Sequence, residues 1–298
     1  MQRLSLPHEI SVPGSIANLG PGLDVLGLAV SLYLRVRVTG VKNDGRGQLT
    51  CRFADGPIGG PNRIAAGFAA PGPLGRRAPS LEVEVRSEIP LRGGLGSSAA
   101  ATIAGLRLRE LVDGRRSRDQ ILDAASKIEG HPDNAAAALH GGVTSCGVRD
   151  DGTIAVASWP WPKAWRVIVA TPQLELATAV SRRVLPKKLP FDDVIYNLQH
   201  LAMVLAALQS GKAAEMREAL GDRVHQPYRA PLVPGLERLL ALRHPDVIGA
   251  CLSGAGPTVA VFAARRAAAV EGVVRAVYAR ERVPCSVRTV TVHREGDA

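Results

Sequence analysis

The most informative stretch of the chain lies between residues 89 and 100 and reads Ile89-Pro90-Leu91-Arg92-Gly93-Gly94-Leu95-Gly96-Ser97-Ser98-Ala99-Ala100. It follows residues 81–86, where apolar and charged side chains alternate with the period of a half-buried strand, and it leads into a predicted helix at 97–112. The glycines allow the backbone to approach a ligand closely, and the free N–H groups at the start of a helix favour an anion, above all a phosphate. The hydroxyls of Ser97 and Ser98 can hold a phosphate oxygen or a magnesium ion.

Three interpretations of this glycine loop compete. A Walker A loop is excluded because no lysine follows Gly96 where that motif requires one. A dinucleotide-binding loop is disfavoured, although residues 94–99 fit the G-x-G-x-x-A pattern. Residues 87–93 separate these glycines from the strand, and Asp119 lies within a predicted helix instead of at a strand end. A tight turn without a ligand would also use glycine here, so the loop by itself leaves phosphate binding and a plain turn open.

Strands and helices are mixed along the rest of the chain. We expect a hairpin over 142–156 with its turn at Asp151-Gly152, and further strands at residues 10–13, 32–38, 49–53, 166–170, 247–252, 258–262 and 286–292. We expect further helices at residues 117–129, 132–141, 175–184, 191–209, 212–220 and 265–280. Ser117 and Gln120 form a capping box, and Pro132 suits the first helical position. Because the elements do not alternate in regular βαβ units, the predicted fold class is α+β.

The segment Trp159-Pro160-Trp161-Pro162 is the best candidate for a domain boundary, because its two prolines interrupt both helix and strand. It predicts a first domain of residues 1–158 and a second domain of residues 159–298.

Composition excludes several classes of protein. The chain has 298 residues, of which 46% are hydrophobic, enough to bury a substantial core and too many for a disordered chain. No long uncharged apolar run is present, and the N-terminal residues lack the apolar stretch of a signal peptide, so we expect neither a membrane span nor secretion. The four cysteines are widely spaced, which disfavours both a disulfide framework and a zinc site. We therefore expect a cytoplasmic protein.

The net charge of +10 raises the question of a nucleic-acid partner. Most of the 37 basic side chains are arginines scattered along the chain, and no run of five basic residues occurs. Nor do basic and aromatic residues form the kind of stripe on which single-strand binders stack bases. We therefore interpret the charge as a solvated arginine-rich surface and expect no nucleic-acid partner.

Three segments together carry a family resemblance. The pattern Pro90-x-x-x-Gly94-Leu95-Gly96-Ser97-Ser98-Ala99 resembles the nucleotide-binding motif of the GHMP kinases, which include galactokinase, homoserine kinase, mevalonate kinase and phosphomevalonate kinase. Two further segments match that superfamily in order and spacing: Val12-Pro13-Gly14-Ser15-Ile16-Ala17-Asn18-Leu19-Gly20-Pro21-Gly22-Leu23-Asp24 and Ser253-Gly254-Ala255-Gly256-Pro257-Thr258.

Within the superfamily, four segments most resemble the homoserine kinase family. They are residues 12–24, Glu129-Gly130-His131-Pro132-Asp133-Asn134, the spacing from Thr178 through Arg182 to Leu185-Pro186, and His225-Gln226-Pro227-Tyr228-Arg229-Ala230-Pro231-Leu232. The resemblance implies two α+β domains, the first similar to the second domain of ribosomal protein S5 and the second ferredoxin-like. It also implies transfer of the γ-phosphoryl group of ATP, with Mg²⁺, to the side-chain hydroxyl of L-homoserine.

The resemblance also implies residue roles. ATP binding falls to Pro90, Leu91, Arg92, Gly93, Gly94, Leu95, Gly96, Ser97, Ser98, Ala99, Ala100, Gly254 and Gly256. Ser98 and Glu129 match the magnesium ligands, and the hard oxygens that Mg²⁺ prefers agree with this. Homoserine is a zwitterion, so its site needs a carboxylate for the ammonium and a cation for the carboxylate.

The substrate positions of the family are matched by Asn18, Asp24, His131, Asp133, Asn134, Arg182 and Arg229. Asn18 and Asp24 match positions near the amino group and the reacting hydroxyl, and Asn134 lies near the hydroxyl. The two arginines match the carboxylate ligands, a role suited to a planar bidentate donor. The resembled family lacks the Asp–Lys base of mevalonate kinase, which implies direct attack by the oriented hydroxyl, with Asn134 and Asp24 as the catalytic residues. Asp24 as a base stays open.

Each residue also has a plainer interpretation. Asn18 and Asp24 could cap a turn, Glu129 could be a solvated carboxylate at a helix end, and either arginine could lie on the surface.

The chain departs from the family at Gly14, Ile16, Leu23, Ala135 and Ala137, all of which are supporting positions. The alternatives are another GHMP small-molecule kinase, an inactive dimerising relative, and a basic nucleic-acid-binding protein. A homodimer is a further possibility.

Overall fold

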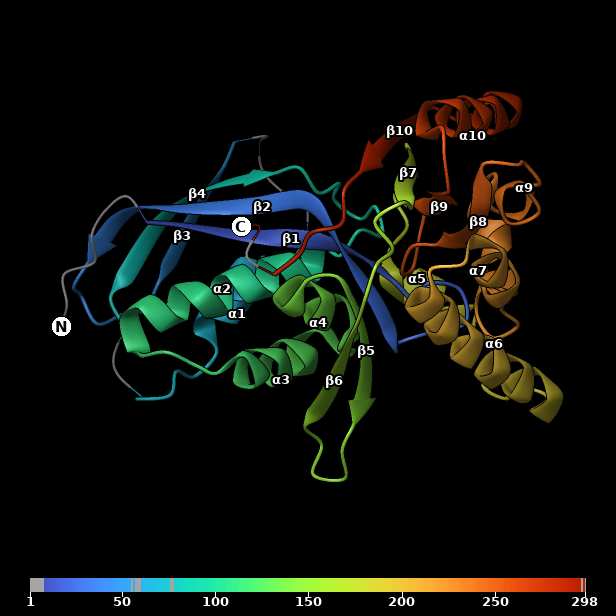
Figure 1. The fold of residues 1–298 in the computed structure, drawn as a ribbon. Coiled ribbons are helices and arrows are strands. Elements are labelled where there is room, and N and C mark those ends of the chain that lie inside the picture. The colour runs from blue at the N-terminus through green and yellow to red at the C-terminus, as the bar shows by residue number, and fades with distance from the viewer. Residues whose placement is uncertain (1–7, 55, 57–59, 76–77, 296, 298) are drawn as a thin grey trace.

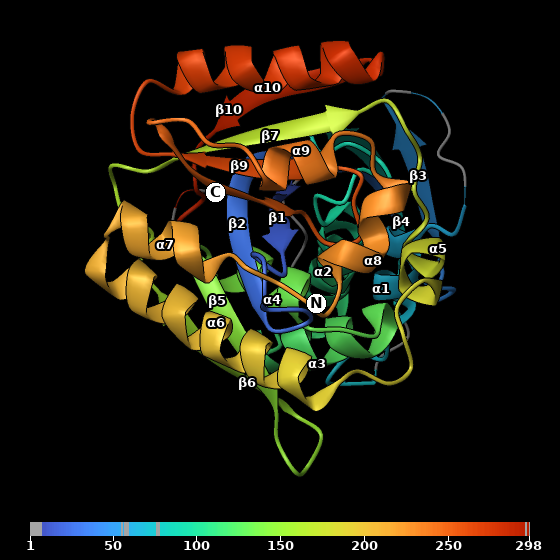
Figure 2. The same cartoon turned by 90° about the vertical axis from the view of Figure 1, so that its right-hand side faces the viewer.

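The computed structural model describes residues 8–54, 56, 60–75, 78–295 and 297, which form two β-sheets with helices packed on them (Figures 1 and 2). The first sheet has six strands in the order β3-β4-β2-β5-β6, with β1 paired to β2. Only β3 and β4 are parallel in it. Its strands are β1 (His8–Ala17), β2 (Leu26–Lys42), β3 (Leu49–Phe53), β4 (Ser80–Ser87), β5 (Val143–Val148) and β6 (Ile154–Trp159).

Helices α1 to α4 cover one face of this sheet (Figure 1). They are α1 (Arg63–Ala69), α2 (Ser97–Asp113), α3 (Arg118–Glu129) and α4 (Asp133–His140). Alternate side chains of β4 are buried at Leu81, Val83 and Val85, as the period of two predicted. The predicted capping box is present, because Gln120 N donates to Ser117 Oγ and Ser117 N to Gln120 Oε1.

Strands β1 and β2 are longer than the strands predicted at 10–13 and 32–38, and they pair as an antiparallel hairpin. The pairing runs down to Ala17 and Gly27, which leaves a short turn at residues 18–25. Gly27 allows α4 to approach closely, since a Cβ there would lie 2.4 Å from the Asp133 carbonyl oxygen. The start of α4 is therefore held directly against β2. Glycine in this part of β2 weakened the strand pattern in the sequence, which is why the prediction began only at residue 32.

The second sheet has the order β10-β7-β9-β8 and is antiparallel throughout. Its strands are β7 (Arg166–Pro172), β8 (Val247–Leu252), β9 (Val259–Ala263) and β10 (Cys285–Val290). One face packs under α9 (Leu236–Leu240) and α10 (Ala267–Glu281), and the other faces α6 (Phe191–Ser210), α7 (Ala213–Ala219) and the core of the first sheet (Figure 2). The remaining helices are α5 (Thr178–Arg183), α8 (Gln226–Arg229) and the 3-10 turn η1 (Ala230–Leu232).

The chain passes from the first sheet to the second between Trp159 and Arg166. After β10 it returns to the first sheet, where Val292 bridges Val30 and Ser31 N donates to the Thr291 carbonyl. Residues of both sheets contribute to one large hydrophobic cluster. The division into domains of residues 1–158 and 159–298 stays a prediction.

The α+β prediction is confirmed, and so is the hairpin of β5 and β6. The sequence did not predict α1, α8 or α9, each of which is seven residues or shorter. The placement of Pro132 at the first helical position was wrong. Pro132 is the N-cap of α4, and the Asp133 carboxylate accepts from the N–H of Asn134.

Among the described residues, none of the helices combines the length and hydropathy that a membrane span requires.

Candidate active site

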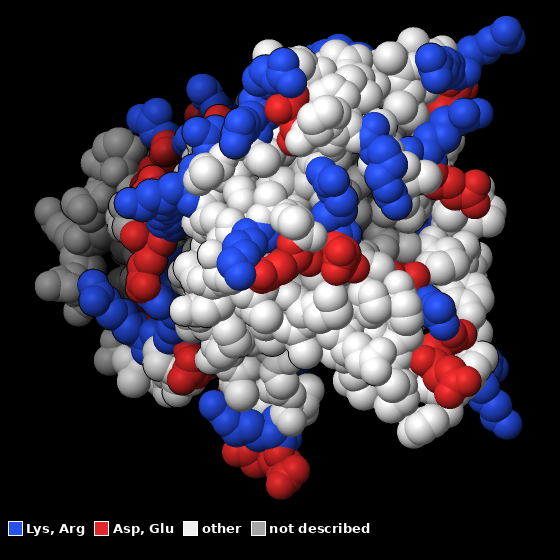
Figure 3. Space-filling model, turned by 45° about the vertical axis from the view of Figure 1, so that its right-hand side comes forward, with Lys and Arg blue, Asp and Glu red and all other residues white. Residues whose placement is uncertain are grey.

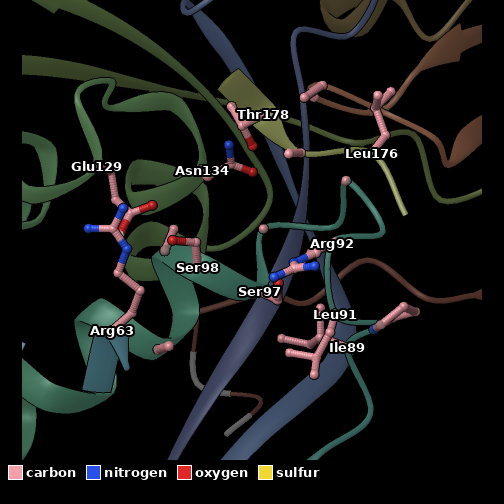
Figure 4. Close-up of a pocket in the computed structure, with 18 of the residues that line it drawn as sticks. Arg63, Ile89, Leu91, Arg92, Ser97, Ser98, Glu129, Asn134, Leu176 and Thr178 are labelled. Carbon is pink, nitrogen blue, oxygen red and sulfur yellow. The ribbon is translucent and has the colours of Figure 1, made fainter. Parts of the chain in front are cut away.

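A cavity of about 870 Å³ lies where two glycine-rich loops, residues 90–96 and 253–258, meet the 18–25 turn and the starts of α2 and α4 (Figure 4). Most of the predicted site residues line it, although they come from distant parts of the chain. The exceptions are Gly93, Leu95 and Ala100, which are buried behind the loop and support it from the core. The structure thus brings the proposed ATP, magnesium and substrate residues to one place.

The two glycine-rich loops interlock. Thr258 N donates to the Gly93 carbonyl at 3.1 Å, and Ser253 Oγ donates to the Gly94 carbonyl at 2.7 Å. Gly94 has φ +81°, and a Cβ there would lie 2.5 Å from the Ser253 carbonyl oxygen and 2.7 Å from that of Gly256. No other residue type fits such a position, so the second loop fixes the shape of the first.

The glycine loop places the start of α2 at the edge of the cavity. Gly96 is the N-cap of α2 with φ +70°, and a Cβ there would lie 2.2 Å from Ser15 Oγ. The first turn, Ser97 to Ala99, lines the cavity with N–H groups that have no partner within the helix. These donors and the positive end of the helix dipole suit a phosphate.

Ser98 and Glu129 lie on the same side of the cavity, with Arg63 beside Glu129 (Figure 4). The Glu129 side chain is only 5% exposed, so it is not the solvated carboxylate of the plainer interpretation. Its Oε1 accepts from Thr102 Oγ1 at 2.6 Å and lies 3.8 Å from Arg63 Nε. A buried carboxylate and a nearby hydroxyl are hard oxygen donors, and this donor set fits Mg²⁺ with water and phosphate as further ligands.

An acidic cluster lies at the start of α4. Asp24, His131 and Asp133 each offer one atom within 4.8 Å of the others. The buried Asp133 carboxylate accepts from His131 Nδ1 at 2.7 Å and from Asn134 N at 2.8 Å. Burial by itself lowers the pKa of His131, but the hydrogen bond and charge of Asp133 outweigh it, and the pKa is raised. Two carboxylates here suit a cation such as an ammonium group.

Asp24 and Arg182 pair with each other across the cavity. Arg182 donates to both carboxylate oxygens, at 3.0 and 2.6 Å, and the hydrogen bond from Arg182 to Asp24 raises the pKa of the arginine. Asn18 holds the turn beside this pair, because its Oδ1 accepts from Asp24 N at 3.1 Å and its Nδ2 donates to the Gly254 carbonyl at 3.0 Å. The sequence placed Asp24 and Arg182 at opposite charges of one zwitterion, and the structure adds that the two are direct neighbours.

Arg229 is a buried cation with its side chain turned to the cavity. It is 2% exposed, and its Nε and Nη1 donate to the carbonyls of Ser181 and Gly254 at 3.2 and 3.1 Å. Burial, followed by the charge of Arg182, lowers its pKa to about 10, so it remains protonated at neutral pH. Within the described part of the chain its Nη2 atom donates no hydrogen bond, which leaves a donor for an anion.

Asn134 is also held in place, since its Oδ1 accepts from Ser15 Oγ at 2.8 Å. The sequence did not single out Ser15, Thr102 and His225, which contact Asn134, Glu129 and Arg229, or Asp222, which holds His225. Ser15 and His225 lie within segments that carry the family resemblance, and this was the only sequence feature that pointed to them. Nothing in the sequence pointed to Thr102.

The chain is similar to known proteins over most of its length. The family model for the GHMP kinases N terminal domain matches residues 64–142, and that for the GHMP kinases C terminal domain matches residues 204–280. The chain is 38% identical to a homoserine kinase of Solibacter usitatus over 289 residues, 94% of each chain. It is 42% identical to a homoserine kinase of Deinococcus radiodurans over 259 residues, 86% of this chain and 84% of that protein.

Solved structures share the fold. A homoserine kinase from Cytophaga hutchinsonii superposes with a TM-score of 0.83 at 24% identity, covering 99% of this chain and 98% of that one. A galactokinase from Lactococcus lactis superposes with a TM-score of 0.71 at 12% identity, covering 97% and 94%. At these identities the likeness establishes the two-domain fold alone.

Proposed function

The chain belongs to the homoserine kinases within the GHMP kinase family, and we propose that it acts through the cavity described above, with each residue in the role that its contacts favour. The activity is ATP-dependent phosphorylation of the side-chain hydroxyl of L-homoserine, which gives O-phospho-L-homoserine on the route to threonine. The observation that carries the proposal is the meeting of a helix-start phosphate site with two arginines and an acidic cluster in one cavity.

The phosphates of ATP bind at the start of α2, where the N–H groups of Ser97 to Ala99 face the cavity. Ser98 and Glu129 would hold Mg²⁺, which when bound neutralises charge on the phosphates. The loop of Gly254 and Gly256 supports this site through its contacts with Gly94. Burial of Glu129 beside Thr102 supports its role, since the carboxylate is already fixed in direction.

The homoserine carboxylate binds Arg182 and the free Nη2 of Arg229, and the ammonium binds the acidic cluster of Asp24, His131 and Asp133. When the substrate binds, Arg182 gives up part of its hydrogen bonding to Asp24 and donates to the substrate carboxylate instead. Asp24 is then a ligand of the ammonium, which disfavours it as a base.

The Asn134 amide orients the substrate hydroxyl, because Ser15 and Asp133 fix its two ends. Attack on the γ-phosphorus is direct, since a loose transition state needs little early loss of the hydroxyl proton. Positioning therefore supplies most of the catalysis.

A coupled ADP-release assay with Mg-ATP tests the proposal against homoserine, mevalonate, galactose and shikimate. We expect turnover with homoserine. Turnover with another acceptor instead would favour a different GHMP kinase, and no homoserine-dependent turnover would overturn the proposal. Asn134→Ala should lower kcat, with Asn43→Ala, which removes an exposed asparagine that does not line the cavity, as the matched control.

We also propose a homodimer formed through α6. Its outer face exposes large apolar side chains in its first half, Phe191 (75% exposed) and Leu198 (57%), and small ones, Ala202 and Ala206, in its second. Two antiparallel copies would pack large against small, and such a patch is typical of an interface. Light scattering should give a dimer that Leu198→Glu dissociates and Leu74→Glu, at another exposed leucine, does not. A monomeric wild type would contradict this.

We further propose a cytoplasmic location, where ATP and free amino acids meet. A nucleic-acid partner is not part of the proposal, because on the face drawn in Figure 3 the basic side chains are interspersed with acidic ones. An affinity for DNA or RNA that falls steeply as the salt concentration rises would favour that alternative.

A further inference from the structure

Arg229 is held by a histidine that lies wholly inside the protein. His225 immediately precedes α8 and is 0% exposed. Its Nε2 lies 2.7 Å from the Gly20 carbonyl oxygen, and its Nδ1 lies 3.2 Å from Arg229 Nη1. A carbonyl can only accept and an arginine can only donate. A single form of the ring satisfies both contacts: neutral, with its proton on Nε2 and a free lone pair on Nδ1.

The surroundings of the ring hold it in that form. Burial lowers the pKa of His225, and the charge of Arg229 acts in the same direction, whereas the charges of Asp222 and the more distant Asp24 raise it. Asp222 is itself occupied, because its carboxylate accepts from the backbone N–H groups of Val224, His225 and Gln226 at 2.9, 3.1 and 2.6 Å. The segment that carries His225 therefore has little freedom to move.

The two contacts of His225 reach the two halves of the substrate site. Gly20 belongs to the 18–25 turn, which also carries Asp24, the proposed ammonium ligand. Arg229 is the proposed carboxylate ligand, and it lines the same cavity. Asn197 of α6 adds a second link, because its Nδ2 donates to the Pro21 carbonyl at 3.2 Å and to Asp222 at 2.7 Å.

We propose that His225 is a positioning residue that aims the Arg229 guanidinium and ties it to the 18–25 turn, so that the spacing between the two sites fits an α-amino acid. This rests on the proposed function. His225 does not touch the substrate. It accepts from Nη1 of Arg229, a residue that lines the cavity, and among the described residues Nη2 donates no hydrogen bond. Without it, Arg229 keeps only its hydrogen bonds to the Ser181 and Gly254 carbonyls, so its guanidinium is aimed less firmly, and binding of a carboxylate becomes weaker while binding of ATP does not.

Three variants separate the two contacts. His225→Asn can place an acceptor where Nδ1 lies but cannot reach Gly20, His225→Gln can place a donor where Nε2 lies, and His225→Leu does neither. His244→Leu, at a partly exposed histidine away from the cavity, is the matched control. The measurements are KM for homoserine and for ATP, and calorimetric binding of homoserine and of 3-aminopropan-1-ol, which lacks the carboxylate.

We expect His225→Leu to raise KM for homoserine by about tenfold to hundredfold, the loss typical of a hydrogen bond that involves a charged group, and to change KM for ATP by less than about twofold. The Asn variant should recover more of the homoserine affinity than the Gln variant. Binding of 3-aminopropan-1-ol should differ little between wild type and variants, because Asn197 still holds the 18–25 turn that carries Asp24.

Equal changes in both KM values, or equal losses with and without the carboxylate, would overturn the inference. If His225→Leu does not fold, the comparison of Asn with Gln decides, and equal homoserine affinities for these two would contradict the role. A wild type that does not phosphorylate homoserine would contradict the proposed function itself, whereas an active wild type with unaffected variants would contradict this inference alone.

Discussion

Gly94→Ala tests whether contact between the two glycine-rich loops sets the geometry of the nucleotide site. Two costs add at this position. The left-handed conformation, φ +81°, costs an alanine about 1–2 kcal/mol. The new Cβ would lie 2.5 and 2.7 Å from two carbonyl oxygens of the 253–256 loop, and these are backbone atoms that cannot swing aside.

The second loop must therefore retreat, which breaks two hydrogen bonds, one from Thr258 N and one from Ser253 Oγ. At about 1 kcal/mol each, their loss brings the total to about 3–4 kcal/mol. Displacement of the phosphate site by about 1 Å should also lower kcat/KM by about a hundredfold.

Gly152→Ala is a matched control, because Gly152 has φ +80° but nothing within 4 Å of its Cβ position. It should show the conformational cost alone, about 1–2 kcal/mol, and normal kinetics. Denaturant unfolding and the ADP-release assay measure both quantities. If Gly94→Ala loses no more stability than Gly152→Ala and keeps its kcat/KM, the interlocking of the loops does not control the site.

Three further outcomes follow from the site. Arg229→Ala should raise KM for homoserine by about tenfold to hundredfold with little change for ATP, and equal changes in steady-state kinetics would argue against its role. Glu129→Gln should raise the Mg²⁺ concentration that gives half-maximal rate, whereas an unchanged magnesium titration would remove Glu129 from the metal site. The pKa of folded His131 is raised above its ordinary value of 6.5, so the protonated ring stabilises the fold below about pH 6.5, and this contribution is lost as pH rises through the folded pKa. His131→Gln should therefore lower Tm more at pH 5.5 than at pH 8.5, and an equal loss at both would contradict the pairing with Asp133.

Sequence patterns correctly predicted those elements that depend only on residues adjacent in the chain. The alternation at residues 81–86 and the capping box at Ser117 were found where expected, because a strand period and a cap depend on a few adjacent residues. The start of β2 was missed because Gly27 is there for the close approach of α4, a contact with a segment far along the chain.

The sequence named residues that the structure brings to one cavity, but it did not predict the contacts among them. The resemblance picked out Asp24 and Arg182 as residues of opposite role, yet only the fold shows that they form a bidentate ion pair. The sequence left a solvated carboxylate open as the plainer interpretation of Glu129, and only the fold shows that this side chain is buried beside Thr102. Such contacts depend on tertiary packing, and no pattern within a short window encodes them.

The interlocking of the two loops also bears on how the chain acquires activity. Ser253 and Gly94 are 159 positions apart in the chain, and their contact forms only when the second sheet has docked on the first. We therefore expect the proposed nucleotide site to be one of the last parts of the molecule to reach its native shape, because non-local contacts of this kind form slowly. Recovery of enzyme activity after dilution from denaturant consequently reports the completion of folding, and a nucleotide that binds this site stabilises the assembled molecule as a whole.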